Sequence, residues 1–210
     1  MLFRSLVVPR PLPRLDYSRG IPQDRRTLVV VPSMLMTAQS IEVLIEALEV
    51  RFLANRDHHL HFGLLTDFRD AREETLADDE PLLLLAKARI EALNEKYADT
   101  NNGITGNAFF LFHRPRRWNP QDRLWMGYER KRGKLTALNA LLRGGAKDNF
   151  LLVVGETDVL SSIKFVITLD TDTQLPRDSA REFVSAMAHP LNRPQFDDAR
   201  QLVTAGYAIL

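Results

Sequence analysis

Two aspartates, Asp170 and Asp172, stand one residue apart directly after an apolar, β-branched run over 165–169. Such a run is typical of a buried strand of an α/β sheet, and ligands of these sheets gather at the carboxyl ends of the strands. Two carboxylates this close repel each other unless a cation joins them. The pattern therefore predicts a site for Mg²⁺ or Mn²⁺, which prefer oxygen ligands. A solvated turn or a helix cap is the alternative interpretation.

A strongly basic segment precedes the aspartate pair. Eight basic and two acidic residues lie between positions 114 and 134, a local balance of +6 in a chain of formal net charge +1. Its end, 130–134, reads Arg-Lys-Arg-Gly-Lys at the start of a helix predicted over 134–142. A helix N-terminus beside such cations attracts phosphate, which makes Arg132 and Lys134 candidate ligand-binding residues. A solvated basic loop is the alternative. The segment is not a Walker P-loop, because Leu135 replaces the Mg²⁺-binding Ser or Thr.

A third candidate, Asp67, follows a strand predicted over 60–66. At the carboxyl edge of the sheet an aspartate can accept a hydrogen bond from the base or sugar of a nucleotide. A turn-forming aspartate fits the spacing equally well. Together, the basic segment and the carboxylate pair suit a nucleotide diphosphate that is bound through a divalent cation.

Apolar periodicity predicts the elements that position these residues. Short apolar runs predict strands at 27–32, 60–66, 109–112 and 165–170, with helices between them. The first helix has Thr37 as its N-cap and an apolar face of Ile41, Leu44, Ile45, Leu48 and Phe52. The second helix covers 81–97, and a capping box at 179–182 begins the last helix. Strands that alternate with helices predict an α/β, Rossmann-like fold, with a mostly parallel sheet and helices on both faces.

The domain organisation follows from proline and charge. Residues 1–26 are basic and rich in proline, so they are predicted to form a lead-in or linker, and 27–210 form the globular domain. Residues 101–106 form a loop by composition. The residues from 202 onward predict a strand that stops in mid-pattern at 210, so we expect a domain truncated at its C-terminus.

Composition restricts the function classes. The chain has 45% hydrophobic and 26% charged residues, which is ordinary for a globular protein. It contains no cysteine, which excludes disulfides, thiolate nucleophiles and Cys-based zinc sites. The near-neutral net charge argues against a nucleic-acid partner. No apolar run approaches the length of about 20 residues that a membrane span needs.

Several segments carry a resemblance. They include Leu-His-Phe-Gly-Leu-Leu-Thr-Asp at 60–67, Trp-Met-Gly-Tyr-Glu-Arg-Lys-Arg-Gly-Lys at 125–134 and Phe-Val-Ile-Thr-Leu-Asp-Thr-Asp-Thr-Gln-Leu-Pro at 165–176. In order and spacing they resemble the nucleotide-sugar core of GT-A glycosyltransferases, and more narrowly the glycosyltransferase region of bacterial cyclic β-1,2-glucan synthases. The resemblance runs from about residue 14 over nearly the whole chain.

The resemblance implies a hexosyltransferase that uses UDP-glucose to elongate a β-1,2-linked glucan acceptor. It implies a larger synthase with further domains, at the cytoplasmic face of the bacterial inner membrane. Asp170 and Asp172 match the metal-binding Asp-x-Asp motif, Asp67 matches a nucleotide-contacting acid, and Lys134 lies in the segment placed near the diphosphate. The general base of such enzymes follows the Asp-x-Asp strand, and we expect it beyond Leu210. The fragment is therefore expected to hold the donor and metal half of the site and to be inactive alone.

Two other interpretations remain open. In a phosphatase of the haloacid-dehalogenase type, Asp170 would form an aspartyl-phosphate and Asp172 would act as acid and base. Against it, too little chain follows for the later lysine and acidic ligands of that class. A non-catalytic nucleic-acid-binding module rests on the +6 segment alone, without an RNA-binding motif.

Overall fold

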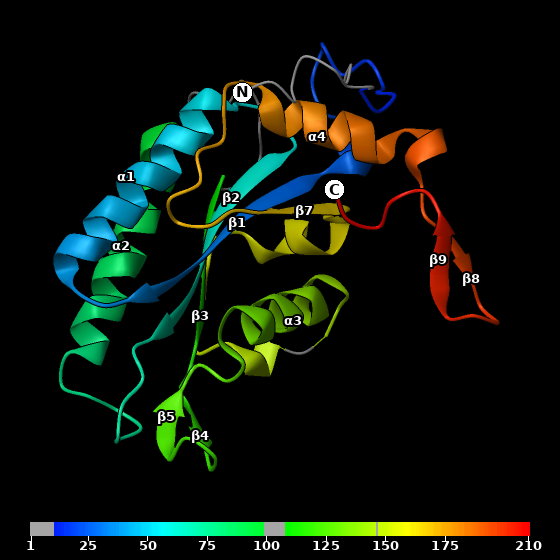
Figure 1. Ribbon diagram of the computed structural model, residues 1–210. Coiled ribbons are helices and arrows are strands. Elements are labelled where there is room, and N and C mark those ends of the chain that lie inside the picture. The colour runs from blue at the N-terminus through cyan, green and yellow to red at the C-terminus, as the bar shows by residue number, and fades with distance from the viewer. Residues whose placement is uncertain (1–10, 99–107, 146) are drawn as a thin grey trace, which may run out of the picture.

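The computed structural model describes residues 11–98, 108–145 and 147–210. The first ten residues of the predicted lead-in and the predicted loop at 101–106 lie outside this part. Five strands form one sheet in the order β6-β3-β2-β1-β7 (Figure 1). The strands are β1 (Thr27–Leu35), β2 (Leu60–Phe68), β3 (Phe109–Arg114), β6 (Leu152–Val154) and β7 (Phe165–Thr168). All neighbours pair in parallel except β6, which is antiparallel to β3. The predicted mostly parallel, Rossmann-like sheet is confirmed.

Helices cover both faces of the sheet (Figure 1). On one face lie α1 (Ala38–Ala54), α2 (Asp79–Tyr97) and α4 (Ser179–Ala188), and on the other lie α3 (Arg130–Leu142) and the 3₁₀ helix η5 (Thr157–Ser162). Residues along β1 alternate between the two cores: Val29 and Val31 join the first, and Leu28 and Val30 join the second. A strand buried on both faces reads as a continuous apolar run, which is the pattern that the sequence shows.

The helix α1 forms where its sequence predicts it. Thr37 is the N-cap: its side chain accepts a hydrogen bond from the Ser40 amide at 3.1 Å, and the Ser40 hydroxyl accepts one from the Thr37 amide at 3.0 Å. This reciprocal capping box satisfies two backbone donors that the helix itself cannot pair. The predicted apolar face packs into the first core.

The start of α3 and the cap of α4 differ from the prediction. The helix α3 begins at Arg130, four residues before the predicted Lys134, so the whole Arg-Lys-Arg-Gly-Lys run is helical. At α4 the predicted capping box is wrong, because Asp178 is the N-cap and has a left-handed backbone with φ of 60°. The Ser179 hydroxyl instead donates to the Pro176 carbonyl at 2.7 Å, so it is a donor in the preceding turn rather than an acceptor for the helix.

The remaining elements lie at the margins of the sheet. Two hairpins, β4 (Arg117–Asn119) with β5 (Leu124–Met126) and β8 (Gln195–Asp197) with β9 (Leu202–Ala205), project from it (Figure 1). The strand predicted from 202 onward therefore ends at Ala205. Before β1, a 3₁₀ turn η2 (Gln23–Arg25) follows Ile21, which is buried in the first core. Within the described residues, no helix combines the length and apolar character needed to cross a bilayer.

Candidate functional site

A buried cluster of three charged side chains lies where β2 and β3 end. The carboxylate of Asp67 accepts hydrogen bonds from Arg114 Nε at 2.8 Å and Nη2 at 2.9 Å, and Lys134 Nζ lies 3.3 Å from Asp67 Oδ2. The side chains of Asp67, Arg114 and Lys134 are only 5%, 9% and 5% exposed. Two cations against one carboxylate leave this charged cluster with a net charge of +1, so it attracts an anion.

Lys134 joins three elements of the fold. It extends from the first turns of α3, pairs with Asp67 of β2 and donates a hydrogen bond to the carbonyl of Ser33 on β1. Burial lowers the pKa of Lys134 below its ordinary value, and the attraction of Asp67 opposes this only in part. The Ser33 hydroxyl is buried beside this lysine and has no hydrogen-bond partner among the described residues.

Two glycines allow the backbone to approach the charged cluster. A Cβ at Gly127 would overlap the carboxylate of Asp67, and a Cβ at Gly133 would overlap the Tyr128 carbonyl and lie 2.9 Å from Arg114 Nη1. Any side chain at either position would displace the groups that hold the cluster together.

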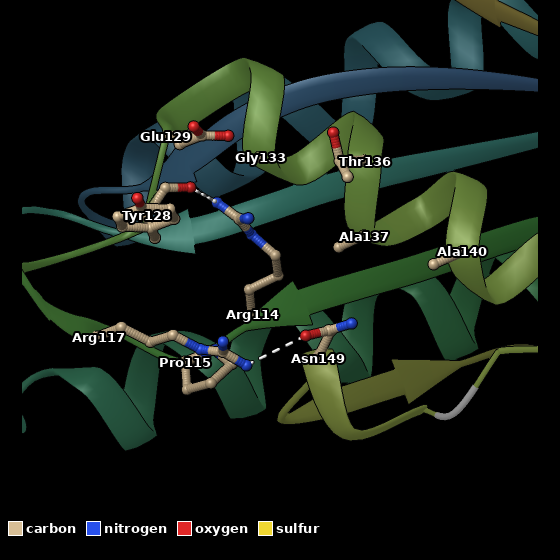
Figure 2. A pocket seen from close by; sticks show the side chains of 10 residues that line it. All are labelled: Arg114, Pro115, Arg117, Tyr128, Glu129, Gly133, Thr136, Ala137, Ala140 and Asn149. Atoms are coloured by element: carbon tan, nitrogen blue, oxygen red, sulfur yellow. Dashed lines mark hydrogen bonds between the residues drawn. The ribbon is translucent and has the colours of Figure 1, made fainter.

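The segment between these glycines is bent tightly. Glu129 and Arg130 both have positive φ, 53° and 46°, which is uncommon for residues other than glycine. The bend turns the carbonyls of Tyr128 and Arg130 toward Arg114 Nη2, which donates to them at 3.2 and 3.3 Å. Figure 2 shows the Arg114 side chain reaching up to the start of α3. Arg114 therefore fixes both Asp67 and the N-terminus of α3.

A cavity of about 780 Å³ opens beside the charged cluster, between the ends of β1 and β2 and the starts of α1 and α3. Its size lies within the usual range of small-molecule sites, roughly 300–1,000 Å³. The apolar side chains that line it are those of Pro32, Met34, Met36, Val43, Leu44 and Phe68. The polar and charged residues that line it are Ser33, Thr37, Gln39, Ser40, Asp67, Asp70, Arg130, Lys131, Lys134 and Thr171. We call it the main cavity.

A smaller cavity of about 240 Å³ lies on the other side of Arg114, under α3 (Figure 2). Arg117 lines it and donates to Asn149 at 3.1 Å. Arg114 lines the smaller cavity, whereas its partner Asp67 and Lys134 line the main cavity.

The aspartate pair lies at the rim of the main cavity. The strand β7 ends at Thr168, and Asp170 and Asp172 follow in an exposed turn. Lys131 lines the cavity and pairs with Asp170 at 2.5 Å, and Thr171, between the two aspartates, also lines the cavity. Asp170 and Asp172 do not line the main cavity themselves, but they flank Thr171, which does.

Arg132 is placed differently from the other predicted residues. Its side chain is 83% exposed, and the nearest carboxylate, that of Glu129, is 3.6 Å away. Arg132 does not line the main cavity. Its role as a ligand-binding residue stays a prediction.

The aspartate pair fits a divalent cation only if other ligands complete the site. Among the described residues, no group of three or more His, Cys, Asp or Glu side chains is placed to hold a metal ion. Asp170 already attracts one cation, the Lys131 ammonium group. Mg²⁺ and Mn²⁺ typically bind through one or two carboxylates with phosphate oxygens and water as the rest. A site of two carboxylates therefore fits these ions together with a phosphorylated ligand.

The sequence pattern does not identify Arg114 of the charged cluster or Gly127, which packs against it. It places Arg114 only within the basic segment and gives Gly127 no role. The structure pairs Asp67 directly opposite Arg114 in the β2–β3 register. The sequence contains a signal for this pair, because Asp67 and Arg114 are each a charged residue near the end of an apolar strand. Neighbouring parallel strands end at one edge of the sheet, so such residues come together.

The fold and the site together define an α/β chain of Rossmann-like architecture with an anion-attracting cavity at the carboxyl ends of its parallel strands. No family model matches the chain. The chain is 40% identical over 209 residues, its whole length, to the cyclic beta-(1,2)-glucan synthase NdvB of Rhizobium meliloti (strain 1021). It spans only 7% of the length of that protein. The resemblance predicted from the motifs is thus confirmed.

Proposed function

We propose that this chain is the donor-binding part of a nucleotide-sugar-dependent glycosyltransferase. The donor is UDP-glucose, and the reaction extends a β-1,2-linked glucan within a larger synthase at the cytoplasmic face of the inner membrane. The observation that carries the proposal is the 40% identity over the whole chain to a cyclic beta-(1,2)-glucan synthase. The site supports it, because the main cavity is lined by apolar side chains and by Asp67 and Lys134 of the charged cluster, and the aspartate pair flanks its lining residue Thr171.

Each part of the donor has a corresponding part of the site. The base and ribose lie against the apolar side chains that line the main cavity, and the diphosphate lies between Lys134 and the aspartate pair. Asp67 has room for one further hydrogen bond, since a carboxylate offers about four lone-pair sites and Arg114 and Lys134 take three. A ribose hydroxyl or a base N–H is a suitable donor for the fourth.

The chemistry assigned to these residues is stabilisation of the leaving group. Asp170 and Asp172 would hold a divalent cation, which when bound would neutralise charge at the diphosphate. Lys134 contributes a fixed positive charge from within the protein, where low polarity strengthens its effect. A β-linked product from an α-linked donor requires inversion, and therefore a base that deprotonates the acceptor hydroxyl. We assign no residue of this chain to that role, so the 210-residue chain is expected to bind UDP without transferring glucose.

Calorimetric titration of the chain with UDP, with and without Mn²⁺, tests the proposal. We expect UDP affinity to increase with Mn²⁺ and the increase to be lost in Asp172→Ala. Lys87→Met is a matched control, because Lys87 is an exposed lysine on α2 that pairs with Glu91 and does not line the main cavity.

Other outcomes would contradict the proposal. Equal UDP affinity with and without Mn²⁺ would show that the aspartate pair does not bind a metal ion together with the diphosphate. Metal-dependent hydrolysis of a phosphate ester would indicate a phosphatase, and salt-sensitive RNA binding would indicate a nucleic-acid module. Glucosyl transfer by the chain alone would show that the base lies within it.

A further inference from the structure

Arg51 of α1 holds the turn that carries the aspartate pair. Its side chain is buried, with the residue only 6% exposed. Nε donates to the Thr173 carbonyl at 3.1 Å, and Nη2 donates to the carbonyls of Thr173 at 2.7 Å and Thr171 at 2.8 Å. A longer contact of 3.5 Å reaches the Asp170 carbonyl. Every acceptor of the guanidinium thus belongs to the four residues that contain both aspartates.

The guanidinium of Arg51 is bound by backbone carbonyls and not by a carboxylate. Among the described residues, Arg51 forms no ion pair, in contrast to Arg114 with Asp67 and Arg116 with Asp79. Burial lowers the pKa of Arg51, although an arginine stays charged at neutral pH. Burying a charge is unfavourable unless hydrogen bonds compensate it. An apolar side chain would fill the same space without that penalty, so the packing alone does not explain an arginine here.

The turn has few other attachments. The strand β7 has only four residues and pairs only with β1 in the described sheet. After it, the Leu169 amide donates to the Val30 carbonyl at 3.0 Å, and the Thr173 amide donates to Asp170 within the turn itself. Within the described residues, the side chains of the pair have one ion-pair partner, Lys131 with Asp170, and this contact is exposed. The backbone that sets the direction of the Asp172 side chain is therefore held mainly by Arg51.

We propose that Arg51 is the positioning residue of the metal site: it fixes the turn so that Asp170 and Asp172 are presented together to a divalent cation bound to a diphosphate. This inference rests on the proposed function. A planar guanidinium suits the task because its donors form a rigid fork that engages several carbonyls at once. The compact ammonium group of a lysine lacks this geometry.

The test compares Arg51→Met and Arg51→Lys with Asn55→Ala. Asn55 is a matched control: it is the buried C-cap of α1, four residues after Arg51, and it holds the segment beyond the aspartates through the Leu175 carbonyl and the Ala180 amide, at 3.1 and 3.0 Å. UDP affinity is measured with and without Mn²⁺ for each variant, together with its melting temperature.

Loss of an outer-shell partner typically weakens metal affinity by about 10–100-fold. We expect the Mn²⁺ concentration for half-maximal UDP binding to rise by about that factor in Arg51→Met, while metal-free UDP affinity changes by less than about twofold. Arg51→Lys recovers part of the loss. Asn55→Ala lowers the melting temperature but keeps the response to Mn²⁺.

A purely structural role gives a different pattern. If both arginine variants keep the wild-type response to Mn²⁺, or if Asn55→Ala loses it equally, Arg51 is not a positioning residue. Should Arg51→Met fail to fold, Arg51→Lys decides the question. A ligand-free measurement separates this inference from the proposed function: amide hydrogen exchange at 170–173 should accelerate in Arg51→Lys and not in Asn55→Ala. Unchanged exchange refutes the anchoring, whereas wild-type protein without Mn²⁺-dependent UDP binding refutes the proposed function.

Discussion

Gly127→Ala should disrupt the charged cluster without changing any charged residue. The added Cβ would overlap Oδ2 and Cγ of Asp67 and lie 2.8 Å from its Cβ, closer than real Cβ contacts. The backbone has little freedom to retreat, because the neighbouring Trp125 is fixed by two hydrogen bonds to Ala71, at 2.9 and 2.8 Å. The carboxylate must therefore move, by more than about 1 Å to reach a normal contact distance.

That movement breaks the interactions of Asp67. Its hydrogen bonds with Arg114 are 2.8 and 2.9 Å long, so a shift of this size leaves Arg114 and Lys134 buried without a counter-charge. Breaking a buried ion pair costs about 3–5 kcal/mol. In a chain of this size each kcal/mol lowers the melting temperature by about 2–4 °C, so we expect a decrease of about 6–20 °C.

Thermal unfolding and UDP titration of Gly127→Ala measure the effect. Gly144→Ala is the control: Gly144 has φ of +81° and no atom within 4 Å of an added Cβ, so it reports backbone strain alone, about 1–2 kcal/mol. A double-mutant cycle isolates the contact, because Asp67→Ala removes the two overlapping atoms. The cost of Gly127→Ala should fall sharply in the Asp67→Ala background. An equal cost in both backgrounds, or a melting temperature unchanged by Gly127→Ala alone, would refute the reasoning.

Two further predictions concern pH. Complete burial lowers the pKa of His113 from 6.5 to about 3, so between these values the unfolded chain binds a proton that the folded chain does not. The free energy of unfolding should therefore fall as pH drops from 6.5 toward 3, by up to about 1.4 kcal/mol per pH unit from this group. In urea denaturation, His113→Gln should make the free energy of unfolding less dependent on pH over this range. The same pH dependence in the variant and the wild type would contradict the lowered pKa of His113. Burial also lowers the pKa of Lys134, so UDP affinity should begin to fall at a lower pH than it would if this lysine had the ordinary pKa of 10.5. Lys134→Arg should remove this decline, because arginine stays charged. Lys134→Met should weaken UDP binding at neutral pH by about 1.5–3 kcal/mol in calorimetric titration, and affinity equal to that of the wild type would exclude a contact with the diphosphate.

Periodicity in the sequence predicts most of the fold, and the exceptions have a common cause. The strands and the buried face of α1 follow from apolar runs and three-to-four-residue spacing. The start of α3 and the cap of α4 do not, because Glu129 and Asp178 adopt left-handed backbone conformations that carry no sequence pattern. Only the surrounding contacts, such as those of Arg114 with the carbonyls of Tyr128 and Arg130, hold the first of these bends.

The site was predictable where it depended on strand ends and helix starts. Asp67 and Lys134 were found this way, since both belong to one edge of a parallel sheet. Arg132 shows the limit of that reasoning: residues two apart on a helix face in nearly opposite directions, so a buried Lys134 places Arg132 in solvent. Arg51 was beyond prediction, because its acceptors are backbone carbonyls more than a hundred positions away in the sequence.

Under the proposed function, the distribution of charge gives the site a preference for a metal-bound diphosphate over a simple anion. The charged cluster of Asp67, Arg114 and Lys134 carries a net +1 inside the protein, whereas Asp170 and Asp172 place negative charge at the rim. A bare phosphate would be attracted by the first and repelled by the second. A diphosphate that carries a divalent cation at its outer side matches both. The same arrangement makes the rim sensitive to geometry, because both carboxylates must face one ion, and Arg51 holds the turn on which they stand.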